Sequence, residues 1–179
     1  RTDSWQRRRQ EEMMERQGVL LSKHGNLYRV VEGYAADVEE KFGIKAYSLP
    51  YQIEFGGAFL KDSAHLAGLG VIGKNNLLVT PEFGTRVRLR GIFMEAELEP
   101  TGPLDFDPCN GCDMPCHRAC PREAFRSGVF ERTLCKKEND KRDADVEILD
   151  GSIMGIDEPS EVTKPCRFCE LACPVAQRA

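Results

Sequence analysis

Apolar residues recur at helical spacing in one early segment of the chain. Between Asn26, a good helix cap, and Gly43, a common helix terminator, they fall on a single helix face. We therefore expect an amphipathic helix over 27–42 that packs on a sheet. The residues on this face are Leu27, Val30, Val31, Tyr34, Ala35, Val38 and Phe42.

Shorter apolar patterns predict further elements in the same half of the chain. A strand is expected at 44–49, ended by Pro50, because a proline cannot donate a ladder hydrogen bond. The segment 62–67 favours a helix, and 75–80 has the apolar run of a buried strand. Helices and strands are thus mixed in the front of the chain.

Residues 85–98 alternate between apolar and polar positions, as a strand does. The alternation shifts at Gly91, and a bulge there explains the shift. The polar face is either a solvated strand face or a docking surface for an acidic electron donor or a nucleotide tail; it consists of Arg86, Arg88 and Arg90. The polar segment 3–17 predicts an exposed helix that ends at Gly18.

Composition and charge narrow the class of protein. Hydrophobic residues make up 41% of the 179 positions, which is enough for a packed core. The net charge of -4 makes a nucleic acid an unexpected partner. No apolar run has the length of a membrane span, so we expect a cytoplasmic protein without membrane contact. The sequence begins at Arg1 rather than at a methionine, which indicates a partial chain.

All eight cysteines lie in the last part of the chain, in close-set groups. A disulfide-stapled domain would spread its cysteines through the fold it staples, so this grouping favours metal ligation by a separate module. The segment 99–108 reads as a linker into that module. The cysteines are Cys109, Cys112, Cys116, Cys120, Cys135, Cys166, Cys169 and Cys173.

The cysteine spacing favours iron–sulfur clusters. The runs CNGCDMPCHRACP and CRFCELACP both end in C-x-x-A-C-P. In two-cluster ferredoxins the last cysteine of each run ligates the cluster of the other run. We therefore predict two [4Fe–4S] clusters. Their expected ligands are Cys109, Cys112, Cys116 and Cys173 for one cluster, and Cys120, Cys135, Cys166 and Cys169 for the other.

Two departures from the ferredoxin pattern and one alternative remain. The first run carries an extra residue before its third cysteine, and Cys135 must reach the second run across the charged segment 136–165, interpreted as a solvated excursion. The alternative is a pair of four-thiolate zinc sites, which use paired C-x2-C hooks but do not need the following C-x3-C-P.

The segment AGLGVIGKNN matches two nucleotide-binding patterns, yet its surroundings match neither. A dinucleotide fingerprint follows a strand and opens a helix, whereas here a helix precedes and a strand follows. A P-loop has Ser or Thr after its lysine, and this chain has Asn75 after Lys74. We expect a helix-to-strand turn, or a close backbone approach to another ligand.

Together, AGLGVIGKNNLLVTPEFG, the two cysteine runs and Cys135 resemble the epoxyqueuosine reductases and the corrinoid-dependent reductive dehalogenases. The resemblance implies a cobalamin-binding α/β domain that receives electrons from a two-cluster ferredoxin-like module. It places the glycine segment at the corrinoid, with Gly68, Gly70, Gly73, Lys74 and Asn75 as binding residues. It also makes Asp62 the candidate proton donor, and the cluster ligands that it implies agree with those given above.

Two functions follow as hypotheses. The first is an oxidoreductase that passes single electrons through two clusters to cobalamin, which reduces a small molecule or a modified nucleoside, with a ferredoxin- or flavodoxin-type donor protein. The second is an electron carrier that reduces a partner protein and binds no organic cofactor. For both we expect an α+β chain, with a small α/β front domain with a mixed sheet at 1–104 and a ferredoxin-like module at 105–179.

Overall fold

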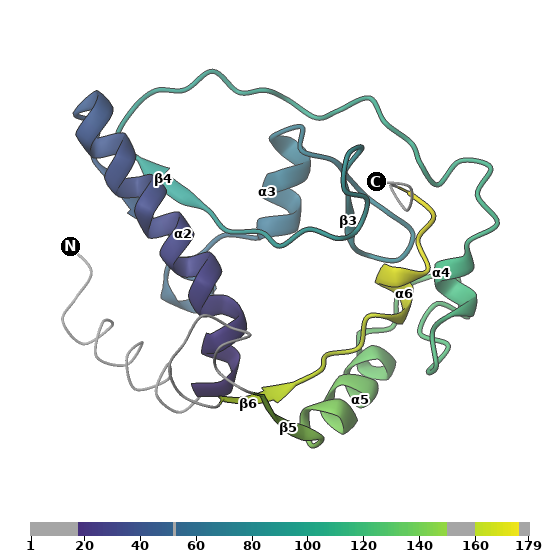
Figure 1. Ribbon diagram of the computed structural model, residues 1–179. Coiled ribbons are helices and arrows are strands. Elements are labelled where there is room, and N and C mark those ends of the chain that lie inside the picture. Colours follow the sequence, from purple (N-terminus) through teal and green to yellow (C-terminus); the bar gives the residue numbers. More distant parts are fainter. Residues whose placement is uncertain (1–17, 52, 150–159, 176–179) are drawn as a thin grey trace. The chain divides into compact units, whose positions relative to one another are not determined.

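The computed structural model describes residues 18–51, 53–149 and 160–175. The chain mixes short helices with two-stranded sheets, in agreement with an α+β class (Figure 1). Its residues form two compact units that are interleaved along the sequence. Unit 1 comprises 1–58, 90–97 and 145–164, and unit 2 comprises 59–89, 98–144 and 165–179.

Unit 1 contains the long helix α2, Gly18–Phe42. Gly43 ends it as expected, with a left-handed φ of 66° and an N–H that donates to the carbonyl of Glu39 at 2.9 Å. The expected start at Asn26 is wrong, because α2 runs through this residue from Gly18. The predicted helix at 3–17 lies outside the described residues.

Fewer residues of α2 are buried than its apolar sequence pattern predicts. Val31 and Ala35 are buried, with 7% and 6% of their surfaces exposed, whereas Val30 and Tyr34 are exposed. Phe42 is exposed as well. The helical spacing therefore located the element correctly, but only part of its apolar face lies against the rest of the unit.

Two antiparallel pairs accompany α2 in unit 1. Strand β1 (Ala46–Ser48) pairs with β4 (Ile92–Met94), and β5 (Val146–Leu149) pairs with β6 (Ser160–Thr163). The first pair confirms the strand expected at 44–49. The strand expected over 85–98 is reduced to β4, because residues 85–91 take no regular strand conformation. The short 3-10 helix η1 (Ile53–Phe55) follows β1.

Unit 2 contains helix α3 (Leu60–Leu66) and a hairpin of β2 (Val71–Ile72) and β3 (Leu78–Val79). Leu78 and Val79 are 3% and 1% exposed, so this hairpin lies in the core. The helix expected at 62–67 and the buried strand expected at 75–80 are both confirmed.

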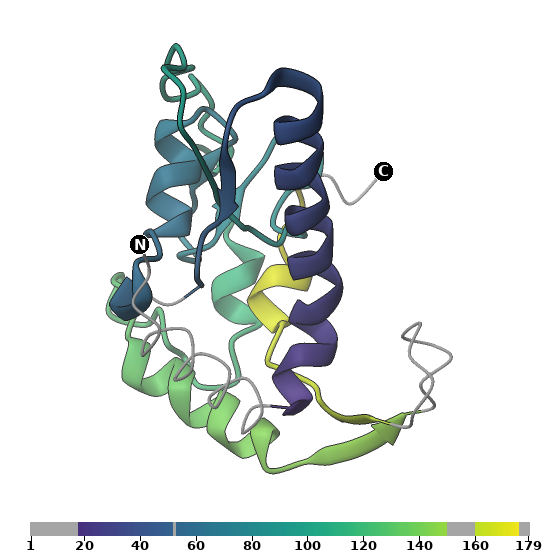
Figure 2. The ribbon, with the colours of Figure 1, turned by 90° about the vertical axis from the view of Figure 1, so that its left-hand side faces the viewer.

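Three further helices of unit 2 carry or follow the cysteine runs. They are α4 (Pro115–Arg118), α5 (Arg132–Asp143) and α6 (Phe168–Leu171). Figure 1 and Figure 2 both show α4 and α6 side by side. Buried Ala124 and Phe125 follow the first run, and the Phe125 ring stacks on His117 with 4.5 Å between ring centroids.

Two sequence expectations differ from these findings. Every strand pair in 18–51, 53–149 and 160–175 is antiparallel, so the mixed sheet of the prediction does not form there. The segment 136–165 is no simple excursion, since it contains most of α5 and the β5–β6 pair. The high charge of this segment gave no apolar pattern from which helix α5 could be predicted, and the buried residue of α5, Glu138, is itself charged.

Candidate functional site

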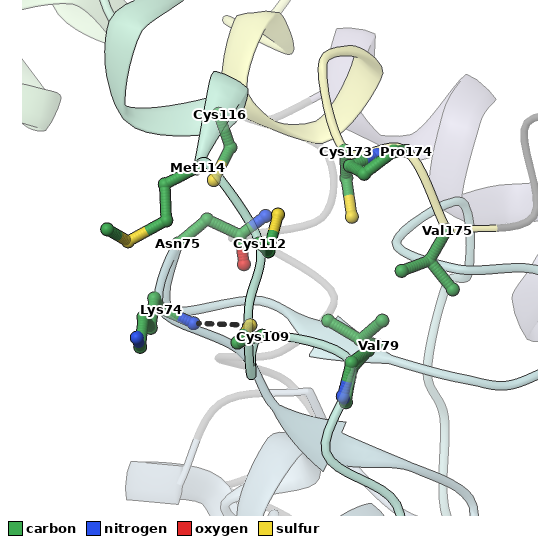
Figure 3. A pocket seen from close by; sticks show the side chains of 11 residues that line it. Lys74, Asn75, Val79, Cys109, Cys112, Met114, Cys116, Cys173, Pro174 and Val175 are labelled. Carbon is green, nitrogen blue, oxygen red and sulfur yellow. Dashed lines mark hydrogen bonds between the residues drawn. The ribbon is translucent and has the colours of Figure 1, made fainter.

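Four cysteines from both runs line one pocket in unit 2. We call Cys109, Cys112, Cys116 and Cys173 the first thiol group; Figure 3 shows their side chains around this pocket. Cys116 and Cys173 are buried, at 7% and 8% exposure. The cysteine from the far run therefore joins three cysteines of the near run, in the combination that the spacing predicted.

Local backbone geometry brings the first run around this pocket. Met114 takes a left-handed φ of 51° and Pro115 follows as the first residue of α4, where a proline costs no helical hydrogen bond. The extra residue of the run is thus used in a turn that places Cys116 on α4. Cys173 lies just beyond α6, which packs beside α4.

The other four cysteines form the second thiol group: Cys120, Cys135, Cys166 and Cys169. The pKa of the Cys169 thiol is raised to about 12, mainly by burial and then by the nearby charges of Cys166, Cys135, Cys120 and, from the first group, Cys116. Burial also raises the pKa of Cys135, again with contributions from Cys166 and Cys120. These mutual effects arise only between thiols that lie close together.

Both thiol groups suit a polynuclear cationic centre. All eight cysteines are free thiols, so no disulfide uses them. Burial raises the pKa of Cys116, and the charge of Cys173 adds to this, because crowded thiolates repel one another. A bound cation removes that repulsion, and soft thiolates select zinc, copper(I) or iron–sulfur centres. Among the described residues, no three His, Cys, Asp or Glu side chains are already gathered as the ligands of a metal ion, so metal binding by these thiols stays a prediction.

Hydrogen-bond donors reach a thiol in each group. The backbone N–H of Lys74 donates to Cys109 Sγ at 3.4 Å, and that of Ala124 donates to Cys120 Sγ at 3.4 Å. Donors of this kind stabilise negative charge on sulfur and are one of the factors that set cluster potentials. Ligation of clusters by the eight cysteines stays a prediction, and these contacts fit it.

The glycine segment lies beside the first thiol group. It connects α3 to β3 as expected, but it also contains strand β2, which the pattern analysis missed. Gly68 has a φ of 69°, and a side chain there would meet the carbonyl oxygen of Gly102 at 2.5 Å. A side chain at Gly73 would lie 2.8 Å from Val79 Cγ2 and 3.5 Å from Cys109 Sγ.

The other expected corrinoid residues also contact the chain itself. The buried carbonyl of Gly70 bonds to His65 Nδ1 at 3.1 Å. Lys74 has an exposed side chain, while its carbonyl bonds to His117 Nε2 at 2.9 Å. Asn75 is 4% exposed, lines the thiol pocket and donates to the carbonyl of Cys169 at 3.4 Å. Contact of these residues with a corrinoid stays a prediction.

Asp62, the candidate proton donor, lies apart from the thiol pocket. It is exposed in the first turn of α3 and is not among the residues that line that pocket. Its neighbour Lys61 donates to the carbonyl and the side-chain oxygen of Asn76, at 2.8 and 3.0 Å, which fixes α3 to the turn after the glycine segment. A catalytic role for Asp62 stays a prediction.

A buried glutamate of α6 pairs with two arginines beside the second cysteine run. Glu170, 8% exposed, accepts from Arg167 Nε at 3.0 Å and from Arg88 at 3.3 Å, and its carbonyl accepts from Thr85 Oγ1 at 2.7 Å. Burial alone would raise its pKa, but hydrogen bonds from Arg167 and the charge of Arg88 lower it. Arg88 thus holds the second run, whereas the sequence suggested only a solvated or docking face.

A second buried glutamate joins the first run to α5. Glu138, also 8% exposed, accepts from Arg122 Nε at 2.9 Å and from Arg142 Nε at 3.1 Å. Burial opposes ionisation, yet the hydrogen bonds from both arginines lower the pKa of Glu138. The sequence analysis missed Glu138 and Glu170. The usable signal was a glutamate near a cysteine with an arginine one helical turn away, four residues after Glu138 and three residues before Glu170.

Curated relatives match parts of the chain. A tetrachloroethene reductive dehalogenase of Sulfurospirillum multivorans is 39% identical over 64 residues, which cover 35% of this chain and 13% of that protein. An epoxyqueuosine reductase of Listeria monocytogenes is 31% identical over 117 residues, covering 62% of this chain and 28% of that protein. No protein-family model matches the chain.

Solved structures match most of the chain. An epoxyqueuosine reductase from Bacillus subtilis has a TM-score of 0.61 and 21% identity, over 87% of this chain and 39% of that one. The chain resembles the epoxyqueuosine reductases in sequence and in fold. This confirms the resemblance indicated by the motifs, although the chain spans well under half of the length of each of these relatives.

One comparison bears on partners. An epoxyqueuosine reductase solved with an epoxyqueuosine-modified tRNA-Tyr stem loop has a TM-score of 0.62 and 22% identity, over 87% of this chain and 39% of that one. The expectation from net charge that nucleic acid is no partner is at odds with that relative. Net charge is a poor guide because a local basic surface can bind RNA on an acidic protein. In the described part of the chain, no helix is long and apolar enough to cross a membrane.

Proposed function

We propose that this chain is the electron-transferring part of an iron–sulfur oxidoreductase of the epoxyqueuosine reductase type. The observation that carries the proposal is that Cys173 of the second run lines one pocket with Cys109, Cys112 and Cys116 of the first run. The proximity of Cys120 to Cys169 supports the reciprocal crossing in the second group. That crossing is the ligand pattern of two-cluster ferredoxins, and a pair of independent zinc hooks has no need of it.

In this proposal the chain's own residues hold and tune the centres. The two thiol groups supply four thiolates each, and buried Asn75 lies between them, lining the first group's pocket while donating to the Cys169 carbonyl. When bound, the two clusters supply a short path for single electrons. The N–H groups of Lys74 and Ala124 stabilise negative charge on Cys109 and Cys120.

The electron acceptor in this proposal is a corrinoid, and the substrate is a modified nucleoside in tRNA. Support comes from the relatives, which include epoxyqueuosine reductases and a reductive dehalogenase, and from the structure of a relative with a modified tRNA stem loop. In this proposal the glycine segment passes electrons onward, which is supported by the hydrogen bond from the Lys74 N–H to a thiol of the first group. A ferredoxin- or flavodoxin-type protein is the proposed donor.

Anaerobic purification followed by metal, sulfide and corrinoid analysis tests the proposal. The expected result is about eight irons and about eight sulfides per chain, with little zinc. Zinc in place of iron would refute it. For the corrinoid, the anaerobic protein is mixed with cobalamin and passed over a sizing column; co-elution with a changed spectrum supports the reductase.

The second candidate is an electron carrier without an organic cofactor. It is favoured by the contacts of the predicted corrinoid residues, since the glycines pack on backbone and Asn75 is buried in the thiol pocket. A protein with a full complement of iron that neither co-elutes with cobalamin nor changes its spectrum supports this carrier function over the reductase.

A further inference from the structure

The cysteines of the second thiol group are more widely separated along the chain than most of those of the first. They come from three separate stretches: the end of the first run, helix α5, and the second run. Between Cys135 and Cys166 the chain leaves unit 2 at Asp145 and returns at Pro165. Bringing the two ends of such an intervening segment together has an entropic cost, so the ligand set needs contacts that hold it closed.

One side chain spans this gap. Asn139 lies on α5, one turn after Cys135. Its Nδ2 donates to the Cys135 carbonyl at 3.5 Å and approaches Cys135 Sγ at 3.8 Å, while its Oδ1 accepts the Cys166 N–H at 3.0 Å. A single amide therefore contacts two cysteines that are far apart in the sequence.

The amide group is chemically suited to this position. It offers a donor to the thiolate side and an acceptor to the backbone N–H, so both contacts form at once. The adjacent residue, Glu138, binds Arg122, which lies two residues after Cys120. Helix α5 thus reaches the other two ligand-bearing stretches through two consecutive side chains.

We infer that Asn139 is a positioning residue of the second metal centre, which sets its ligand geometry and, through the contact with Cys135 Sγ, its reduction potential. This rests on the proposed iron–sulfur function. The second run lacks a third cysteine close in sequence, and Asn139 compensates for this because it holds Cys135 against the start of that run.

The test uses anaerobic, cluster-loaded protein and four variants. N139L is isosteric and removes both contacts, and N139D keeps the acceptor but replaces the donor with negative charge. K137L places the same leucine at an exposed position of α5 and is the matched control. C135S defines the electron paramagnetic resonance signal that remains when the second group loses a ligand.

N139L is expected to drop from about eight to about four irons per chain and to show the C135S signal, while K137L keeps both clusters. N139D is expected to keep both clusters and to lower the potential of only the one whose signal C135S removes, because negative charge disfavours the reduced cluster. A purely structural asparagine would leave both clusters and both potentials unchanged in N139L, which removes the donor to Cys135 Sγ without adding charge.

If the wild type contains its full complement of iron, and N139L and N139D keep both clusters at unchanged potentials, the inference about Asn139 is overturned but the proposed function is not. Equal loss of both clusters in N139L would also overturn it, since the effect would not be selective. Wild-type protein that carries zinc instead of iron would overturn the proposed function as well, and metal analysis of the wild type therefore separates the two failures.

Discussion

The two thiol groups lie in the same unit but are assembled by different means. The first is built by a short loop, a left-handed turn at Met114 and the packing of α4 on α6, with a backbone N–H of Lys74 as its donor. The second depends on side chains, because its cysteines come from three stretches. Asn139 and Glu138 connect those stretches, and Glu170 holds the second run against Arg88.

This difference shows how a protein compensates for a long interruption in a ligand motif. Where cysteines are close in sequence, backbone turns are enough to direct them inward. Where an inserted segment separates them, buried ion pairs and a bridging amide replace the missing covalent proximity. The first group should therefore tolerate side-chain changes around it, and the second should not.

The largest effect is expected from exchanging the crossed ligands. Cys173→Ser should remove the first cluster and Cys120→Ser the second, each leaving about four irons per chain. Iron analysis and electron paramagnetic resonance of the reduced protein measure this. The signal lost in C173S should match the one lost in C109S; a match with C166S would show that the groups are not crossed.

A smaller effect is expected from Glu170→Ala, which leaves Arg88 and Arg167 without their shared partner. The free energy of unfolding should fall by about 1–3 kcal/mol, less than for a fully buried pair because both arginines are partly exposed. Urea unfolding of anaerobic protein followed by circular dichroism measures the change.

The matched control for that variant is Glu123→Ala. Glu123 also pairs with an arginine three residues away, but on the surface, so the loss should stay within about 0.5 kcal/mol. Similar losses for the two variants would contradict the special role assigned here to burial around the second group.

Acid should abolish the contribution of Glu138 to the stability of the folded chain. Because its folded pKa is lowered, the stabilisation is complete above the unfolded carboxyl pKa of about 4.3 and disappears as pH falls through the folded value. Chelator-driven iron release should be faster in Glu138→Gln than in wild type at pH 7, and the difference should begin to shrink as pH falls below about 4.3. A constant ratio across that range would exclude the linkage.

The smallest effect is expected from Lys74→Ala. The side chain is exposed and the contact with Cys109 comes from the backbone, so the first cluster should keep its potential and stability should change by less than about 0.5 kcal/mol. Potentiometric titration of both clusters measures this. A selective shift of the first cluster would show that the lysine side chain, too, acts on the metal centre.

The sequence was most informative where a local rule applies. Helical spacing located α2, the left-handed preference of glycine located its end at Gly43, and the run LLV located buried β3. It was misleading for 85–98, where alternation suggested one strand but only β4 forms, since strand extent depends on a partner. Likewise, Asn26 signalled a helix start, whereas α2 runs through this residue from Gly18.

For the candidate site, cysteine spacing anticipated that Cys173 joins Cys109, Cys112 and Cys116 at one pocket, because cluster motifs place ligands by short covalent loops. It could not reveal that Asn75 and the Lys74 N–H face these thiols, since nothing in the sequence shows that the glycine segment folds against the first run. Glu138, Glu170 and Asn139 were missed for the same reason: their partners are distant in sequence or on a helix that high charge concealed.

The crossed grouping also has a consequence for biosynthesis. A nascent chain that has emerged only as far as Cys135 carries five of the eight cysteines but neither complete set, because each group waits for the second run. If the two groups hold clusters as proposed, insertion of both would be a late event, after translation has passed Cys173, and a ribosome that stalls earlier would leave thiols exposed to oxidation.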